Sequence, residues 1–400
     1  MSSTAQQIRQ WQGPAILSLA FRLFFLLGAV WAMLSMVIWI AMLTGTLQLA
    51  SSFDPVSWHA HEFLFGYLPI VLAGFLFTAV PNWTGRLPVV GWPLLWLAGL
   101  WLAGRAAVAY SALLPLVIVI TADLSFLAVT LLVVGREIVA GKNWRNLPVL
   151  VMLLVLFFAN GWFHLENWQG NYAAGGYGLR LGLAAAVMMI ALIGGRIVPS
   201  FTRNWLAKRG SPGLPVPFNR FDRASLSVMV LALFAWIAAP DAVWTGLALM
   251  IAGALQLWRL ARWRGDRTGA EPLVWVLHAG YLFVPLGAIS LGASITFPAS
   301  LAAANAQHVW MAGAIPVMTL AVMTRATLGH TGRELHAGAM TTMIYAAIIA
   351  ACVLRVGNTL WPWADGLGHV LAAMAWLLAF AGFIVVYGPM LSGQRRQGPG

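Results

Sequence analysis

Long apolar stretches separated by short polar segments are the main feature of this sequence. A helix needs about 20 mostly apolar residues to cross the hydrocarbon core of a bilayer. The stretches are apolar on every side instead of alternating, which favours helices over the strands of a membrane barrel. The sequence therefore predicts an all-α, polytopic membrane protein with about twelve transmembrane helices. They are expected near residues 22–46, 58–80, 88–109, 112–134, 147–165, 178–198, 224–239, 241–260, 271–292, 301–324, 338–356 and 364–388.

The composition excludes several other classes of protein. Hydrophobic residues make up 61% of the chain and charged residues 8%, whereas soluble chains carry about 25% charged residues. We therefore expect residues 1–400 to form a single integral membrane domain surrounded by lipid. The one cysteine, Cys352, excludes a disulfide framework and a cysteine-held metal cluster. A net charge of +12 would indicate nucleic acid only on a clustered soluble face, so no nucleic-acid partner is expected.

The basic residues predict the orientation of the chain. Of the 23 lysines and arginines, 20 lie in alternate segments that share one side of the predicted bundle. Cytoplasmic loops of membrane proteins carry such an excess of basic residues. Both termini are therefore predicted to be cytoplasmic, with an N-terminal segment at 1–20, a long loop at 199–223 and a tail at 389–400. The opposite loops, at 47–57, 166–177, 293–300 and 357–363, contain no basic residue. No internal repeat is evident.

Three arginines fall inside or at the outer end of predicted spans: Arg105, Arg180 and Arg355. An arginine there is costly unless it is paired, faces a cavity or reaches the interface. One interpretation is that each extends its guanidinium to the outer headgroups. The other is that they bind anionic groups such as haem propionates, because the guanidinium fork matches a carboxylate.

Five histidines are candidate ligands for a metal or for haem iron. His59, His61, His164 and His308 lie in or beside spans toward the outer side, and His278 lies nearer the cytoplasmic side. Neutral imidazole is a common ligand of transition metals and of haem iron. Any one of them is equally well explained as a hydrogen-bonded packing residue. His59 and His61 point about 200° apart on a regular helix, so both cannot bind one ion.

Carboxylates accompany these histidines. Glu62 follows His59 by three residues and is a candidate proton donor, metal ligand or orienting partner of an imidazole, or else a helix cap. Asp123 is the one carboxylate near the middle of the membrane and suits either a proton relay or a neutral, hydrogen-bonded acid. Asn160 precedes His164 by four residues and shares its helix face.

Several segments of the chain together resemble the signature of the NnrS family. They are residues 21–25, 58–66, 73–85, 195–206 and 318–333. The resemblance implies a multi-pass protein of the bacterial inner (cytoplasmic) membrane that contains haem b and copper and is linked to nitric oxide, denitrification and nitrosative stress. A non-haem iron is the alternative second metal. His59, His61 and Glu62 lie within these segments, and His308 lies next to the last of them. His164 and His278 correspond more loosely.

Three functions are compatible with these features. The first is an oxidoreductase that reduces nitric oxide to nitrous oxide at a haem and a second metal near the periplasmic side, with Glu62 as proton donor. Its electrons would come from an external donor, either a quinol or a cytochrome or cupredoxin. The second is a sensor or detoxification protein that binds nitric oxide without turnover. The third is a twelve-helix transporter without a redox centre, which the absence of repeats disfavours.

Overall fold

The computed structural model describes residues 11–86, 88–298, 302–360 and 367–394. Within these ranges the chain forms helices and no strands, and twelve helical spans are long and apolar enough to cross a membrane. The predicted fold class and number of spans are therefore confirmed. The spans are α2 (Ala20–Leu43), α3–η2–α4 (Pro55–Thr84), α5 (Trp92–Ala109), α6 (Leu116–Ala140), α7 (Leu147–Trp168), α8–η6–α9 (Tyr177–Lys208), α10 (Arg220–Ala238), α11 (Val243–Ala261), α12 (Pro272–Thr296), α13–η8–α14 (Ala303–His330), α15 (Ala339–Leu360) and α16 (Leu367–Ser392).

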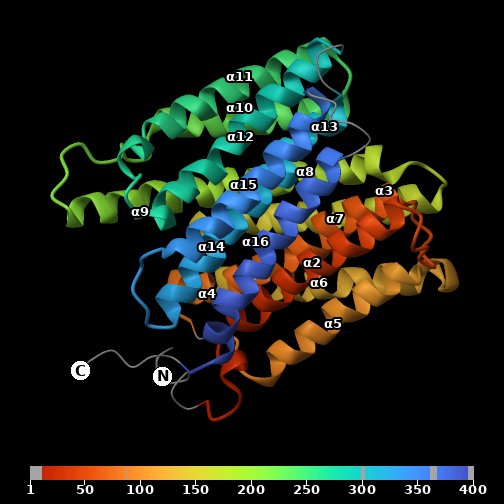
Figure 1. Cartoon of the computed structure of the whole chain (residues 1–400), viewed down its shortest axis with the longest axis horizontal. Coiled ribbons are helices and arrows are strands. Elements are labelled where there is room, and N and C mark those ends of the chain that lie inside the picture. The colour runs from red at the N-terminus through yellow and green to blue at the C-terminus, as the bar shows by residue number, and fades with distance from the viewer. Residues whose placement is uncertain (1–10, 87, 299–301, 361–366, 395–400) are drawn as a thin grey trace. The chain divides into compact units, whose positions relative to one another are not determined.

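The contacts divide the chain into two compact units. The first comprises Met1–Ala185, Ala326–Glu334 and Phe383–Gly400, and the second comprises Ala186–Arg325 and Leu335–Gly382. In the first unit α2 packs on α4 and α5 packs on α6, which also contacts α4 and α7. In the second unit α10, α11 and α12 lie side by side (Figure 1).

The sixth span is longer than its hydrophobicity predicts. Its last helix, α9 (Gly195–Lys208), continues to Lys208 instead of ending near residue 198. The expected loop at 199–223 is thereby reduced to the segment between Lys208 and Arg220, where α10 begins with a capping box formed by Asn219 and Asp222. The sequence did not predict this extension because the end of α9 is polar, and a hydropathy pattern detects only the apolar part of a helix.

Three spans are interrupted by a π-helical turn. These turns are η2 (Glu62–Tyr67), η6 (Ile190–Gly194) and η8 (Val309–Ala314). The three spans bury 67–72% of their apolar windows, against 33–61% in the other nine described spans. They are therefore the most buried spans of the described chain. Such turns occur frequently at functional sites, and hydrophobicity gives no sign of them.

Two of these spans share a pattern of residues and turns, which makes them two diverged copies of one segment. With a constant offset of 247 positions, His61, Gly66 and Pro69 correspond to His308, Gly313 and Pro316, and the sequence Thr84-Gly85-Arg86 recurs as Thr331-Gly332-Arg333. The π turns η2 and η8 occupy equivalent residues, and Gly85 and Gly332 both adopt a left-handed conformation, with φ of 71° and 73°.

The expectation that the chain has no internal repeat is therefore wrong. Most core positions of the two copies carry different apolar residues, so the identities are few and widely spaced. Because parallel repeats also occur in carriers, symmetry no longer argues against a transporter. The distinction must come from the chemistry of the site.

Close packing of α5 on α6 gives a test of the first unit. A Cβ added at Gly104 would lie 2.9 Å from the Cα of Asp123, whereas one at Gly99 on the same helix meets nothing within 4 Å. We expect Gly104→Ala to separate the helices and to cost roughly 1–3 kcal/mol of unfolding free energy. Gly99→Ala should be neutral or slightly stabilising, because alanine favours a helix over glycine. Equal thermal unfolding of the two variants in detergent would contradict this packing.

Candidate metal centre

The second span begins with a helix cap that positions the histidines. Asp54 accepts hydrogen bonds from the backbone N–H groups of Val56 and Ser57 at 2.9 and 3.0 Å, and Pro55 occupies the first turn of α3 (Pro55–His61). Both features favour the start of a helix. His61 ends α3, and Glu62 begins the π turn η2. Both side chains are almost completely buried.

Three side chains from two helices converge on one oxygen of Asp123, which lies on a third helix. His61 Nε2 lies 3.0 Å, His164 Nε2 2.9 Å and Asn160 Nδ2 2.8 Å from Asp123 Oδ2. The Oδ1 atom of Asn160 lies 3.0 Å from His61 Nε2. His61 comes from α3, Asp123 from α6, and Asn160 and His164 from one face of α7, and all of them are buried.

A second carboxylate and an arginine complete the buried charges. Arg105 Nη1 donates to both carboxylate oxygens of Glu62, at 2.8 and 2.7 Å, and its Nη2 donates to Asp123 Oδ1. Two carboxylates and one guanidinium leave one negative charge uncompensated before the imidazoles are counted. Since a buried unpaired charge is costly, this environment favours a positive charge beside Asp123, either a protonated imidazole or a bound cation.

The arrangement has the geometry of a metal site. The candidate ligand atoms of His61, Asp123 and His164 all lie within 4.8 Å of one another. The Nε2 atoms of His61 and His164 lie at hydrogen-bond distances of 3.0 and 2.9 Å from Asp123 Oδ2, so the three atoms are near enough to share one ion. Two imidazoles and one carboxylate form the ligand set typical of non-haem iron(II).

Glu62 orients one of these imidazoles. Its Oε1 lies 3.2 Å from His61 Nδ1. Because a carboxylate can only accept, the hydrogen bond places a proton on Nδ1, and the Nε2 atom, which faces Asp123, is the one available to a cation. Metal-bound histidines commonly hold such a carboxylate on their second nitrogen. A Cβ at Gly66 would lie 2.7 Å from Glu62 Oε2. Only glycine therefore leaves room for the Glu62 carboxylate in this position.

Aromatic rings surround the cluster. Phe53 stacks on His61 at a centroid distance of 5.3 Å and contacts His164 at 5.4 Å. Phe65 and Phe163 contact His61 at 5.4 and 5.6 Å. These buried rings keep water from the charged groups and make the immediate surroundings of the cluster apolar.

The other candidates of the first unit lie elsewhere. The ring of His59 stacks on Trp39 at 4.4 Å, outside the group around Asp123. Arg180 donates to the carbonyl oxygen of Gly175 at 2.7 Å and lies over the ring of Tyr177, so it holds the turn before α8. Of the predicted residues, the structure therefore brings His61, Glu62, Arg105 and His164 together.

The second unit holds the remaining candidates. His308 stands directly before η8, at the position equivalent to His61, and its Nδ1 lies 2.6 Å from the carbonyl oxygen of Ala304. Arg355 donates to Asn305 Oδ1 at 2.8 Å. His278 Nε2 lies 2.8 Å from the hydroxyl of Thr202, a contact that suits a packing role.

The central role of Asp123 could not be inferred from the sequence. Its depth in the membrane and the shared face of Asn160 and His164 were visible signals. The partners of Asp123 lie 62, 37 and 41 residues away, and only the packing of the helices shows that they meet.

The comparisons with known proteins agree with the resemblance found in the sequence. No match was found among curated proteins. The profile of the NnrS protein family matches residues 15–395, nearly the whole chain. The chain is therefore a member of the NnrS family, a multi-pass membrane protein linked to nitric oxide that carries a possible histidine–aspartate metal site.

Proposed function

We propose that the protein reduces nitric oxide to nitrous oxide, and that His61, Asp123 and His164 hold the non-haem metal ion that takes part. The observation that carries the proposal is the buried set of two imidazoles and one carboxylate, in surroundings that hold two carboxylates and one guanidinium. Nitric oxide is small and neutral, so it can reach an apolar site inside the bilayer. The ring shell formed by Phe53, Phe65 and Phe163 suits such a substrate better than a charged one.

The ligand set favours one kind of metal. Soft copper(I) prefers sulfur ligands, whereas two imidazoles and a carboxylate suit non-haem iron(II) or copper(II). We therefore favour iron(II) or copper(II) over copper(I) at this site. When bound, the ion supplies a redox-active centre that binds nitric oxide. His61 Nε2, which otherwise donates a proton to Asp123, would release that proton in order to hold the ion.

Glu62 and Arg105 act on the histidine in this proposal. Glu62 fixes the orientation and proton position of His61, and Arg105 holds Glu62 and Asp123 in place through both ends of its guanidinium. The role of proton donor also remains proposed for Glu62. It would require the carboxyl to release its hydrogen bonds from Arg105 before it could bind and pass on a proton.

We propose that a haem b would be held in the second unit, with its iron bound by His308. The hydrogen bond from Nδ1 to the carbonyl of Ala304 leaves Nε2 as the ligand atom. Val309 replaces the glutamate of the other copy, so the site lacks the carboxylate that suits a bare cation. Arg355, whose hydrogen bond goes to the neutral amide of Asn305, suits a propionate. The residues present therefore fit a haem.

The balance of the reaction requires other molecules. Two nitric oxide molecules, two electrons and two protons give one nitrous oxide and one water. We propose that a quinol or a cytochrome or cupredoxin supplies the electrons, and that the protein lies in a bacterial inner membrane.

Binding of nitric oxide without turnover is the second candidate function. The observation that favours it is the double hydrogen bond of Arg105 to Glu62, which holds this carboxyl as an ion pair instead of a ready acid. A protein of this kind would bind nitric oxide and release it unchanged, or transfer it to another acceptor.

The ligand assignment is tested by metal analysis of purified variants. We expect His61→Ala, His164→Ala and Asp123→Asn each to lose most of the non-haem metal, because each removes one of three ligands. His59→Ala is the matched control, two residues from His61 on the same helix, and should retain the metal. If only the control variant lost the metal, the result would contradict the assignment and indicate His59 as the ligand instead.

The haem assignment has a separate readout. We expect His308→Ala to lose the Soret band of the purified protein, and Arg355→Gln to weaken haem retention because the propionate partner is removed. His336→Ala, which changes a partly exposed histidine paired with Glu271, should keep the normal spectrum. A full Soret band in His308→Ala would refute this ligand.

Turnover is tested anaerobically with reduced, fully metallated protein. We expect nitrous oxide to form from nitric oxide in the wild type and to fall at least a hundredfold in Asp123→Asn. Glu62→Gln should retain part of the metal and lose more activity than metal, because it keeps the shape but not the charge that orients His61. Reversible binding of nitric oxide without nitrous oxide would establish the second candidate function instead.

A further inference from the structure

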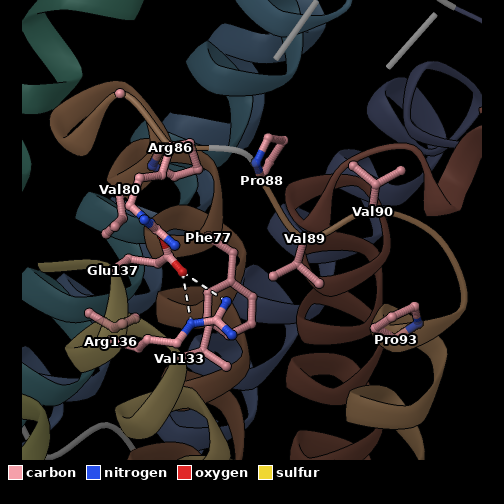
Figure 2. A pocket seen from close by; sticks show the side chains of 13 residues that line it. Phe77, Val80, Arg86, Pro88, Val89, Val90, Pro93, Val133, Arg136 and Glu137 are labelled. Carbon is pink, nitrogen blue, oxygen red and sulfur yellow. Dashed lines mark hydrogen bonds and ion pairs between the residues drawn. The ribbon is translucent and has the colours of Figure 1, made fainter. Parts of the chain in front are cut away.

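A cavity of about 580 Å³ lies at the far ends of the helices that carry the metal cluster. It is formed by the last turns of α4 (Leu68–Thr84) and α6 (Leu116–Ala140) and by residues 88–93 before α5 (Figure 2). Phe77 and His61 are 16 residues apart in one span, or about 24 Å along a helix. The cavity is therefore separate from the cluster around Asp123.

The walls of this cavity are mostly apolar. Phe77 and Val80 come from α4, Val133 and Val134 from α6, and Val89 and Val90 from the segment between the second and third spans (Figure 2). A cavity of several hundred cubic ångströms with apolar walls and few polar groups is typical of a site for a small organic ligand.

Charged groups gather at one side of the cavity. Glu137 Oε2 accepts from Arg86 Nε, and Glu137 Oε1 accepts from Nε and Nη2 of Arg136, at 2.9 and 2.8 Å. A guanidinium has five N–H donors, so these bonds leave four donors on Arg86 and three on Arg136. Two arginines and one glutamate give a net charge of +1, and both arginines are substantially exposed.

We propose that this cavity binds an anionic phospholipid from the bilayer, with the phosphodiester at Arg86 and Arg136 and the start of an acyl chain along the valines. Charge complementarity supports this occupant, because the unused arginine donors match the phosphate oxygens. The site lies on the side expected to be cytoplasmic, where basic pockets between helices bind anionic headgroups. A free phosphate would use the arginines but leave the apolar walls exposed to water.

Lipid-dependent stability of the purified, detergent-solubilised protein tests the proposal. We expect phosphatidylglycerol to raise the unfolding temperature and phosphatidylcholine to have little effect. The double variant Arg86→Gln/Arg136→Gln should weaken the apparent affinity for phosphatidylglycerol about tenfold or more. Lys142→Gln/Arg145→Gln is the matched control, since it removes the same charge from the neighbouring loop without touching the cavity.

A second variant tests the apolar part of the site. Val89→Trp fills the cavity and keeps both arginines, so it should also weaken binding of phosphatidylglycerol. Equal stabilisation by phosphatidylcholine, equal stabilisation by inorganic phosphate, or equal losses in the double variant and its control would each overturn the proposal. None of these measurements depends on nitric oxide or on a metal. The lipid site and the proposed reaction are therefore tested independently.

Discussion

Buried charge around Asp123 is the constraint on which the site depends. Two carboxylates, a guanidinium and two imidazoles lie inside a bundle that otherwise has an apolar interior. Removing one partner from a buried ion pair leaves an uncompensated charge and costs about 3–5 kcal/mol. Such a group is therefore stable only when all its members are held together. Here Arg105 connects Glu62 to Asp123, and Gly66 and Gly104 permit the close approach that these contacts require.

The two related spans place a histidine in the same position but give it different neighbours. His61 and His308 stand at equivalent positions, each directly before a π turn of six residues. The first copy has glutamate after its histidine, and the second has valine. The Nδ1 atom of the imidazole faces a carboxylate in the first span and a backbone carbonyl in the second. The first arrangement belongs to a possible metal site, and the second has no carboxylate beside its histidine.

The two ends of the first unit have different electrostatic character. Around Asp123 the charges are buried, hydrogen-bonded on several sides and enclosed by aromatic rings. Around Glu137 two arginines are substantially exposed and retain most of their donors. The buried cluster around Asp123 favours a cation that replaces a proton on an imidazole. The exposed arginines around Glu137 favour an anion from the membrane surface. The same two spans, α3–η2–α4 and α6, contribute residues to both ends.

The sequence alone determined the class of fold, the number of spans and several members of the site, including His61, Glu62, Arg105 and His164. Hydrophobicity is sufficient for this because a bilayer requires long apolar helices and makes each intramembrane charge conspicuous. Only the tertiary structure decided that Asp123 is the centre of the cluster, that His59 faces Trp39, and that Arg180 belongs to a turn. These facts depend on the rotation of each helix and on π turns that shift it. Both are set by packing against neighbouring helices, which a pattern along one chain does not record.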